Sequence, residues 1–349
     1  MNNITIKNKT AFLDLIKAKP EDQDKFDGEK ATTYRHFKIR KHNGERHIYA
    51  INPTSLIYIY QHNLYINFLS KLLFPECVFG FRKERSYFDF LVPHISKQSK
   101  RYYLRMDISS FFESIQLSDV KESFRYYLDK NIDEEDKDEI CEYFIKIVSY
   151  KDKIVQGAIT SPAISNLVFR SLDIRITKYC QHFGITYTRY ADDLLLSCNR
   201  KIIFSYGFQK CIQAILSDKG FTLNLDKTLK FNDEISLNGY VIGENIRLSR
   251  KKVSKLNKVL FELSQSDFVE LKNERARLIL INKLAGYRAF FINSMKYIEE
   301  PIRIEKTENM PRIFTGTLCA KAVTEILSFI FGRMGRNCIA DGTFTIFFP

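Results

Sequence analysis

The tetrapeptide YADD at residues 190–193 carries two adjacent carboxylates between two strand-like runs, and Asp107 ends another such run within LRMDISSFF. A two-residue turn between antiparallel strands requires residues that tolerate turn geometry, and Asp is one of them. Three carboxylates that meet on such a scaffold would bind hard divalent cations, which prefer oxygen ligands. Two such ions can activate an attacking 3′-hydroxyl and stabilise a departing pyrophosphate. Because an isolated Asp-Asp pair is usually a solvated turn, the surrounding segments must decide between these interpretations.

Strands and helices that could position these carboxylates are apparent from the apolar periodicity of the chain. Asn43-Gly44 between two alternating runs is a strong hairpin signal, and the runs are rich in Arg and Lys. Ser161-Pro162 begins a clear helix, since Pro is favoured in the first turn. The predicted elements are a hairpin over 34–53, helices over 54–74, 117–150, 161–182 and 203–219, a strand before Asp107, strands around YADD, strand-like runs over 221–231 and 235–243, and basic helical segments over 249–297.

The composition is that of a folded protein with a basic surplus. Over 349 residues the chain is 45% hydrophobic and 27% charged, with a formal net charge of +13 and a pI near 9.2. Lys and Arg that neutralise phosphates release condensed counterions, so a surplus of this size favours a polyanionic partner. The charge alone is equally compatible with a basic surface that has no nucleic-acid role.

The seven cysteines and the lengths of the apolar runs predict in which cellular compartment the protein is found. The number of cysteines is odd and none is spaced as C-x-x-C, which argues against a zinc ribbon and a secreted disulfide framework. Free thiols in a reducing cytosol predict a cytoplasmic protein. The N-terminal segment lacks a basic region followed by a long apolar run, so we expect no signal peptide. The apolar runs are too short to span a membrane, and we expect no membrane partner.

Seven segments resemble the conserved blocks of the reverse-transcriptase family, in the correct order, over roughly residues 35–295. Residues 46–53 resemble the first block and GFRKERS at 80–86 the second. LRMDISSFFESI resembles palm motif A, QGAITSPAISNLVFRSLD motif B, YTRYADDLLLS motif C, GFTLNLDKT motif D and LNGYVIG motif E. The resemblance implies an α+β right-hand polymerase with fingers, palm and thumb, in which an antiparallel palm sheet carries the YADD hairpin and the thumb is helical.

The resemblance also assigns roles to individual residues. Asp107 and Asp192 would be the main metal ligands, and Asp193 would be a nearby carboxylate with a weaker role. The Ile108 carbonyl would complete a shell for two Mg²⁺ ions, with Mn²⁺ as the substitute. Phe112 would be the steric gate that excludes a ribose 2′-hydroxyl, rather than a core aromatic. Lys227 would be either a general acid toward pyrophosphate or an ordinary surface lysine. Arg46 and Arg82 would cover the triphosphate, and Gln156 and Gly157 would lie along the nucleotide pocket. Tyr190 and Ala191 would contact the primer end.

The implied domains are an N-terminal extension at 1–30, fingers at 31–100, a palm at 101–245 that includes part of the fingers around 117–160, a helical thumb at 246–300, and residues 301–349. This last segment would complete the thumb, contact RNA or hold an oligomer together. Basic residues on the predicted thumb helices could follow a duplex backbone through phosphate contacts, or could be ordinary solvated positions. They are Lys251, Lys252, Lys255, Lys258, Arg275 and Arg277.

The chain is too short for a retroviral connection domain with ribonuclease H, and it resembles the retron and related defence-associated reverse transcriptases of bacteria. It lacks the Asn-Ala-x-x-His element of retrons, and Leu237-Asn238-Gly239 stands where retrons have Val-Thr-Gly. The broader defence-associated class is therefore favoured, with retrons as near neighbours. The resemblance implies an RNA-directed DNA polymerase that copies an associated noncoding RNA in anti-phage defence. Its partners would be that RNA as template or primer, the RNA–DNA duplex, deoxynucleoside triphosphates (dNTPs), an effector or companion defence protein, and a second copy of the chain.

Two other hypotheses remain open. The same site could make an untemplated, protein-primed or RNA product, and a sequenced product without a complementary template would support this. Alternatively, the chain could be an RNA-binding scaffold with a vestigial site, which predicts normal function in an Asp192→Ala, Asp193→Ala double variant. The presence of all three carboxylates, Gln156 and Phe112 disfavours the scaffold.

Overall fold

The computed structural model describes residues 4–19, 33–41, 44–96, 100–252 and 254–255, together with the short paired strands β10 (Ile302–Arg303) and β11 (Thr317–Leu318). The chain forms two compact units. One comprises residues 1–94 and 99–233, and the other comprises residues 95–98 and 234–349. The first unit holds all of the predicted catalytic residues.

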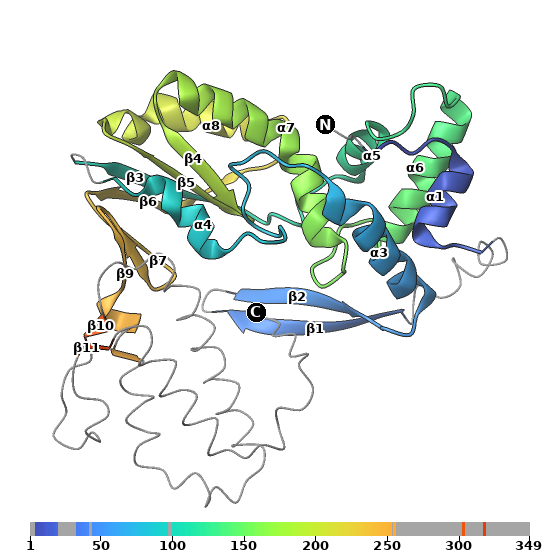
Figure 1. Cartoon of the computed structure of the whole chain (residues 1–349), viewed down its shortest axis with the longest axis horizontal. Helices are drawn as coiled ribbons and strands as arrows, with labels where there is room; N and C mark the ends of the chain where they lie inside the picture. The colour runs from blue at the N-terminus through green and yellow to red at the C-terminus, as the bar shows by residue number, and fades with distance from the viewer. Residues whose placement is uncertain are drawn as a thin grey trace, which may run out of the picture. The chain divides into compact units, whose positions relative to one another are not determined.

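The first unit contains a four-stranded antiparallel sheet, with α7 (Ser161–His182) and α8 (Tyr206–Ser217) beside it (Figure 1). Its strands follow the order β4 (Thr186–Tyr190), β5 (Asp193–Cys198), β3 (Tyr102–Ile108) and β6 (Leu223–Asn232). The two central strands are buried along most of their length on both faces, as strands covered on both sides are. The sheet confirms the strands predicted before Asp107 and around YADD.

Helix α7 (Ser161–His182) carries much of the core against this sheet, and α8 (Tyr206–Ser217) packs beside it. Pro162 lies in the first turn of α7, where its missing N–H costs nothing. The helix buries Phe169, Leu172 and Ile176 at the three- and four-residue spacing of one helical face. It ends before Gly184, which has φ +64°. The predicted helix at 161–182 is confirmed to the residue.

The first unit also contains a hairpin and several helices, which Figure 1 labels. Strands β1 (Tyr34–Lys41) and β2 (Gly44–Ile51) pair as predicted from Asn43-Gly44. The predicted helix at 54–74 is shorter, because α3 (Leu56–Asn67) gives way to a 3₁₀ turn at Leu69–Lys71. This unit also contains α4 (Tyr87–Leu91), α5 (Leu117–Arg125) and α6 (Glu134–Val148), with 3₁₀ turns at Val92–His94 and Lys201–Phe204.

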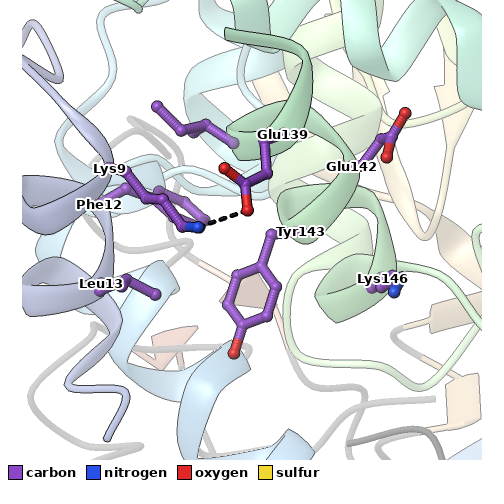
Figure 2. Close-up of a pocket in the computed structure, with 8 residues that line it drawn as sticks. Lys9, Phe12, Leu13, Glu139, Glu142, Tyr143 and Lys146 are labelled. Carbon is purple, nitrogen blue, oxygen red and sulfur yellow. Dashed lines mark hydrogen bonds and ion pairs between the residues drawn. The ribbon is translucent and has the colours of Figure 1, made fainter. Parts of the chain in front are cut away.

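Helix α1 (Lys9–Ile16), within the predicted N-terminal extension, is part of the first unit's core, since Phe12 and Ile16 are fully buried. Lys9 pairs with Glu139 of α6 beside a cavity of about 230 Å³ between the two helices (Figure 2). None of the predicted site residues lines this cavity.

The second unit contains a three-stranded meander of β7 (Ile235–Leu237), β8 (Tyr240–Ile242) and β9 (Ile246–Leu248). Asn238 and Gly239 connect β7 and β8 with positive φ angles of 47° and 94°, as a two-residue hairpin loop requires. The described part of 249–255 is helical from Arg250, which agrees with the start of the predicted thumb helices. Most of the predicted thumb and almost all of 301–349 lie outside the described residues. Among the helices that the structure describes, none is long and apolar enough to cross a membrane.

Candidate active site

The central strands bring the YADD hairpin against Asp107. Asp107 on β3 lies directly opposite Asp193 on β5, and the Ile108 N–H donates to the Asp192 carbonyl at 3.1 Å. Ala191 and Asp192 form the two-residue loop between β4 and β5. Positive φ occurs at Ala191 (56°) and not at Asp192, which differs from the expectation that Asp supplies the turn geometry. The pattern matches a type II′ hairpin turn, whose first loop residue is usually Gly.

Each of two carboxylates already has a basic partner. The Arg105 guanidinium donates to Asp193 Oδ1 at 2.6 Å, and Lys227 Nζ donates to Asp107 Oδ2 at 2.9 Å. Arg105 and Asp107 lie two residues apart on β3, so their side chains share one face of the sheet. Within the described ranges, no three His, Cys, Asp or Glu side chains converge as a metal-ligand group. Asp193 pairs with Arg105, and the predicted metal site of three carboxylates stays a prediction.

Burial perturbs the two carboxyl groups of the turn. It raises the pKa of Asp192, and repulsion from Asp107 adds to this, while the charges of Lys227 and Arg46 oppose it. Burial likewise raises the pKa of Asp193, and Arg105 opposes that shift. Buried carboxylates that repel one another are stabilised by a nearby cation. Asp107, Asp192 and the Ile108 carbonyl offer oxygen donors of the kind that hard divalent metals prefer. These residues fit a divalent metal.

Asp192→Asn is expected to raise the melting temperature of the metal-free protein at pH 7. Because the folded-state pKa of Asp192 is raised, the unfolded chain releases this proton more readily, and stability falls as pH rises through the raised pKa. Asn carries no charge and avoids that cost, so the gain should shrink as pH falls toward the ordinary Asp range. Thermal unfolding of the wild type and the variant in the presence of a chelator would measure the difference in melting temperature, with Asp218→Asn on the surface as the control. An unchanged or lower melting temperature would contradict the electrostatic account.

The YADD turn is supported by the segment 77–82. The Phe79 N–H donates to the Arg189 carbonyl at 2.9 Å, and the Arg189 N–H donates to the Cys77 carbonyl at 2.7 Å. The segment thus extends the sheet at the free edge of β4. A Cβ on Gly80 would lie 2.4 Å from the Ala191 nitrogen, so only glycine fits at this contact.

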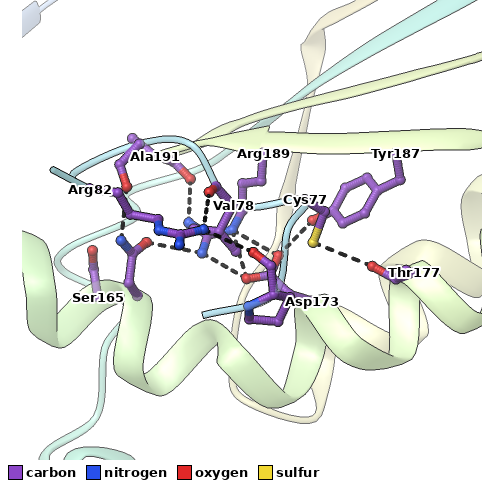
Figure 3. A network of polar contacts seen from close by, with 12 residues as sticks. Cys77, Val78, Arg82, Ser165, Asp173, Thr177, Tyr187, Arg189 and Ala191 are labelled. Atoms are coloured by element: carbon purple, nitrogen blue, oxygen red, sulfur yellow. Dashed lines mark hydrogen bonds and ion pairs between the residues drawn. The ribbon is translucent and has the colours of Figure 1, made fainter. Parts of the chain in front are cut away.

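A buried network centred on Arg189 connects this segment, α7 and the turn (Figure 3). Arg189 is fully buried and forms a bidentate pair with Asp173 of α7, at 2.9 and 2.7 Å. Its guanidinium also donates to the Ala191 carbonyl at 3.1 Å and to Asn166 Oδ1 at 3.0 Å. Asn166 in turn donates to the Gly80 carbonyl at 2.9 Å. The position of the turn is therefore fixed by a charged group whose donors are satisfied inside the core.

The predicted nucleotide pocket lies where β2 meets motif B. The Tyr49 N–H donates to the Gln156 carbonyl at 2.8 Å, and a Cβ on Gly157 would lie 2.7 Å from the Tyr49 carbonyl oxygen. Gly157 has φ +107°, so both its conformation and this close approach require glycine. The Gln156 amide donates to Glu113 at 3.3 Å. The structure thus brings the Gln156-Gly157 backbone directly against the fingers hairpin.

Arg46 is near enough to Asp192 to influence its pKa. Its Nε is buried, and among the described residues it has no hydrogen-bond partner. A buried donor without an acceptor is costly, so an anion bound at this position would be stabilised.

The other predicted residues are placed as follows. Arg82 Nη1 donates to the Val78 and Pro75 carbonyls, so this nitrogen is used within the segment 77–82. The Tyr190 ring packs against Tyr87 and Phe90. Ala191 is buried under Gly80, and its predicted primer contact stays a prediction.

The basic residues of the predicted thumb are only partly described. Lys251 and Lys255 are exposed in the second unit, whereas the Lys252 stem packs against Gly239. Burial lowers the pKa of Lys252. Lys258, Arg275 and Arg277 lie outside the described residues.

Sequence reasoning missed the support for the site, namely Arg105, Asn166, Asp173 and Arg189. One signal was available. In TYTRYADD a charged residue falls within a strand otherwise made of Thr and Tyr, and a buried Arg requires a partner.

Comparisons with known proteins agree with this geometry. A family described as "Reverse transcriptase (RNA-dependent DNA polymerase)" matches residues 39–242. The Retron Ec86 reverse transcriptase of Escherichia coli is 28% identical over 254 residues, which cover 71% of this chain and 75% of that protein. The Retron Ec73 reverse transcriptase of Escherichia coli is 29% identical over 265 residues, with coverages of 72% and 79%.

The chain is also similar to solved structures. One is apo telomerase from Candida Tropicalis truncated from its C-terminal domain, with a TM-score of 0.45 and 13% identity. The match covers 62% of this chain and 55% of that one, so this chain spans about half the length of the telomerase.

Proposed function

Because the match to residues 39–242 covers more than half of it, this chain belongs to the reverse-transcriptase family, and we propose that it copies an associated noncoding RNA into DNA by two-metal nucleotidyl transfer. As a family member it is an RNA-directed DNA polymerase with a right-hand polymerase fold, and the retron relatives confirm the predicted retron-type kinship. The observation that carries the proposal is the placement of Asp107 against the YADD turn. The noncoding RNA, the RNA–DNA duplex, dNTPs, an effector and a second copy are its proposed partners, and anti-phage defence is its proposed role.

Asp107, Asp192 and the Ile108 carbonyl would hold Mg²⁺, or Mn²⁺ in its place. When bound, the ions supply Lewis-acid activation of the primer 3′-hydroxyl and neutralise charge on the phosphates. Asp193 contributes through Arg105, because their pairing fixes the β5 strand beside Asp107.

The other residues bind and orient the nucleotide. Arg46 offers its unpaired Nε to the triphosphate, since an anion satisfies a donor that the protein leaves without a partner. Gln156 and Gly157 hold the nucleotide against β2, where the absence of a side chain lets the backbone approach. The Phe112 ring excludes a ribose 2′-hydroxyl by steric conflict. Lys227 donates a proton to the departing pyrophosphate.

Primer extension on a defined RNA template tests the proposal directly. A DNA primer annealed to RNA, with dNTPs, should be extended to the template end in Mg²⁺ or Mn²⁺ and not in a chelator. The rate should rise more steeply than the first power of free Mg²⁺ if two ions act. Failure to extend any RNA-templated primer, by a protein that unfolds cooperatively, would contradict the proposal.

Lys227→Met is expected to lower the maximal rate of nucleotide incorporation by about 10²-fold, the lower end of general-acid contributions. Lys227 is half-exposed and contacts Asp107 in the present structure, so it can reach the site from β6 without a rearrangement of the sheet. Lys227→Arg should retain part of the rate, because Arg keeps the charge but releases its proton poorly. Rapid-quench measurement of single-nucleotide incorporation would show this. An unchanged rate in Lys227→Met would identify Lys227 as a surface lysine.

A further inference from the structure

Phe81 has a backbone conformation that a bulky residue rarely adopts. Its φ is +59°, in the left-handed region, where a side chain collides with the backbone and glycine is usual. Its ring is nevertheless 39% exposed, so burial of the ring does not compensate for the strain. A strained non-glycine residue beside a catalytic turn is a recurrent mark of a functional position.

The residues on both sides of Phe81 enforce this conformation. Phe79 is hydrogen-bonded to β4, and the Gly80 carbonyl accepts from Asn166 of α7. On the other side, the Arg82 guanidinium returns to the Val78 carbonyl at 3.0 Å. Figure 3 shows Arg82, Val78 and Ala191 in this arrangement. The chain therefore turns sharply at Phe81, and the turn directs the ring out of the core.

The exposed ring of Phe81 meets Phe112. Their ring centroids lie 6.1 Å apart with an interplanar angle of 51°. Phe112 also contacts Phe111, with ring centroids 5.5 Å apart, and Phe111 belongs to the core. Phe112 thus packs against both a core ring and a ring held by a strained turn.

We infer that Phe81 is a positioning residue for sugar discrimination: its ring holds Phe112 in the orientation that excludes a ribose 2′-hydroxyl. The inference rests on the proposed function, in which Phe112 is the steric gate. Without the Phe81 ring, Phe112 can rotate toward the space left behind, and ribonucleotides should then enter. The strain at residue 81 is retained because the ring is needed at this position.

Single-nucleotide incorporation opposite a templating uridine in RNA tests the inference, with kcat/KM measured for dATP and for ATP. Phe81→Ala should reduce the preference for dATP by about tenfold, comparable to the loss of one well-packed contact in a specificity pocket. Phe81→Tyr retains the ring and should retain the preference. The ratio of kcat/KM for dATP to kcat/KM for ATP does not depend on the fraction of active enzyme. Partial unfolding of a variant therefore cannot imitate a loss of preference for dATP.

Phe81→Gly separates strain from contact. It should lose as much preference as Phe81→Ala, yet melt at a higher temperature than Phe81→Ala, because glycine adopts positive φ without strain. Tyr206→Ala, which removes an aromatic ring that is 80% exposed on α8, serves as the control and should leave the preference unchanged.

The possible failures can be distinguished. If Phe112→Ala loses the preference and Phe81→Ala keeps it, the inference is wrong and the proposed gate stands. If Phe112→Ala also keeps the preference, both the gate and the inference are wrong. If the wild type incorporates neither nucleotide, the proposed function itself fails.

Discussion

Asp107→Asn and Asp192→Asn are each expected to reduce RNA-templated DNA synthesis by about 10³-fold or more. Each removes the charge of a proposed metal ligand at the point where β3 meets the YADD turn, and the loss of several kcal/mol of charge stabilisation corresponds to a rate effect of this size. Asp193→Asn should cost less, about tenfold, because its side chain is paired with Arg105 and acts on the site indirectly. Steady-state primer extension with purified variants would measure the three rates.

Asp218→Asn is the matched control, since it makes the same chemical change at an exposed ion pair with Arg175. It should keep the wild-type rate. Equal losses in the Asp192 and Asp193 variants would show that Arg105 releases Asp193 to the metals during synthesis. A retained rate in Asp107→Asn would contradict the assignment of the site.

Arg189→Leu is expected to lower the free energy of unfolding by about 3–5 kcal/mol, the usual cost of leaving one partner of a buried ion pair alone. Arg189 and Asp173 are both fully buried, and other donors of Arg189 bind the Ala191 carbonyl of the YADD turn and Asn166. Urea denaturation at neutral pH would give the value. In a double variant that also replaces Asp173 by Leu, no charge remains unpaired, so the combined loss should be smaller than the sum of the two single losses.

Additive losses in this cycle would contradict a direct coupling between Arg189 and Asp173. The surface pair Arg175–Asp218 provides the comparison, because exposed ion pairs contribute about 0–1 kcal/mol. Arg175→Leu should therefore leave the unfolding free energy nearly unchanged.

The palm could be predicted from the sequence because its elements have strong local signals. Apolar periodicity gave α7 its bounds, and Pro162 marked its start. The strand-like runs on both sides of YADD identified β4 and β5, and Asn43-Gly44 between alternating runs identified the hairpin of β1 and β2. The sequence predicted that Asp107 lies near the YADD carboxylates, and the strand register places it opposite Asp193.

The contacts of the site could not be predicted, because they join residues that are distant in sequence. Asp173 and Arg189 lie on different elements, and no periodicity reveals that they pair. The turn geometry was assigned to Asp, whereas Ala191 carries the positive φ. Gly80 lies against this turn, since a Cβ on residue 80 would meet the Ala191 nitrogen, and this contact also joins residues that are distant in sequence. Arg105 likewise binds Asp193 only because β3 and β5 are neighbours.

The most direct test of the central claim is deep sequencing of the nucleic acid that copurifies with the wild type and with an Asp192→Ala, Asp193→Ala variant. Templated reverse transcription predicts DNA that is present only with the wild type and complementary to one bound RNA, which would also identify the template. RNA bound equally by both proteins, with no DNA from either even when Mg²⁺ and all four dNTPs are supplied, would contradict the claim and support an RNA-binding scaffold.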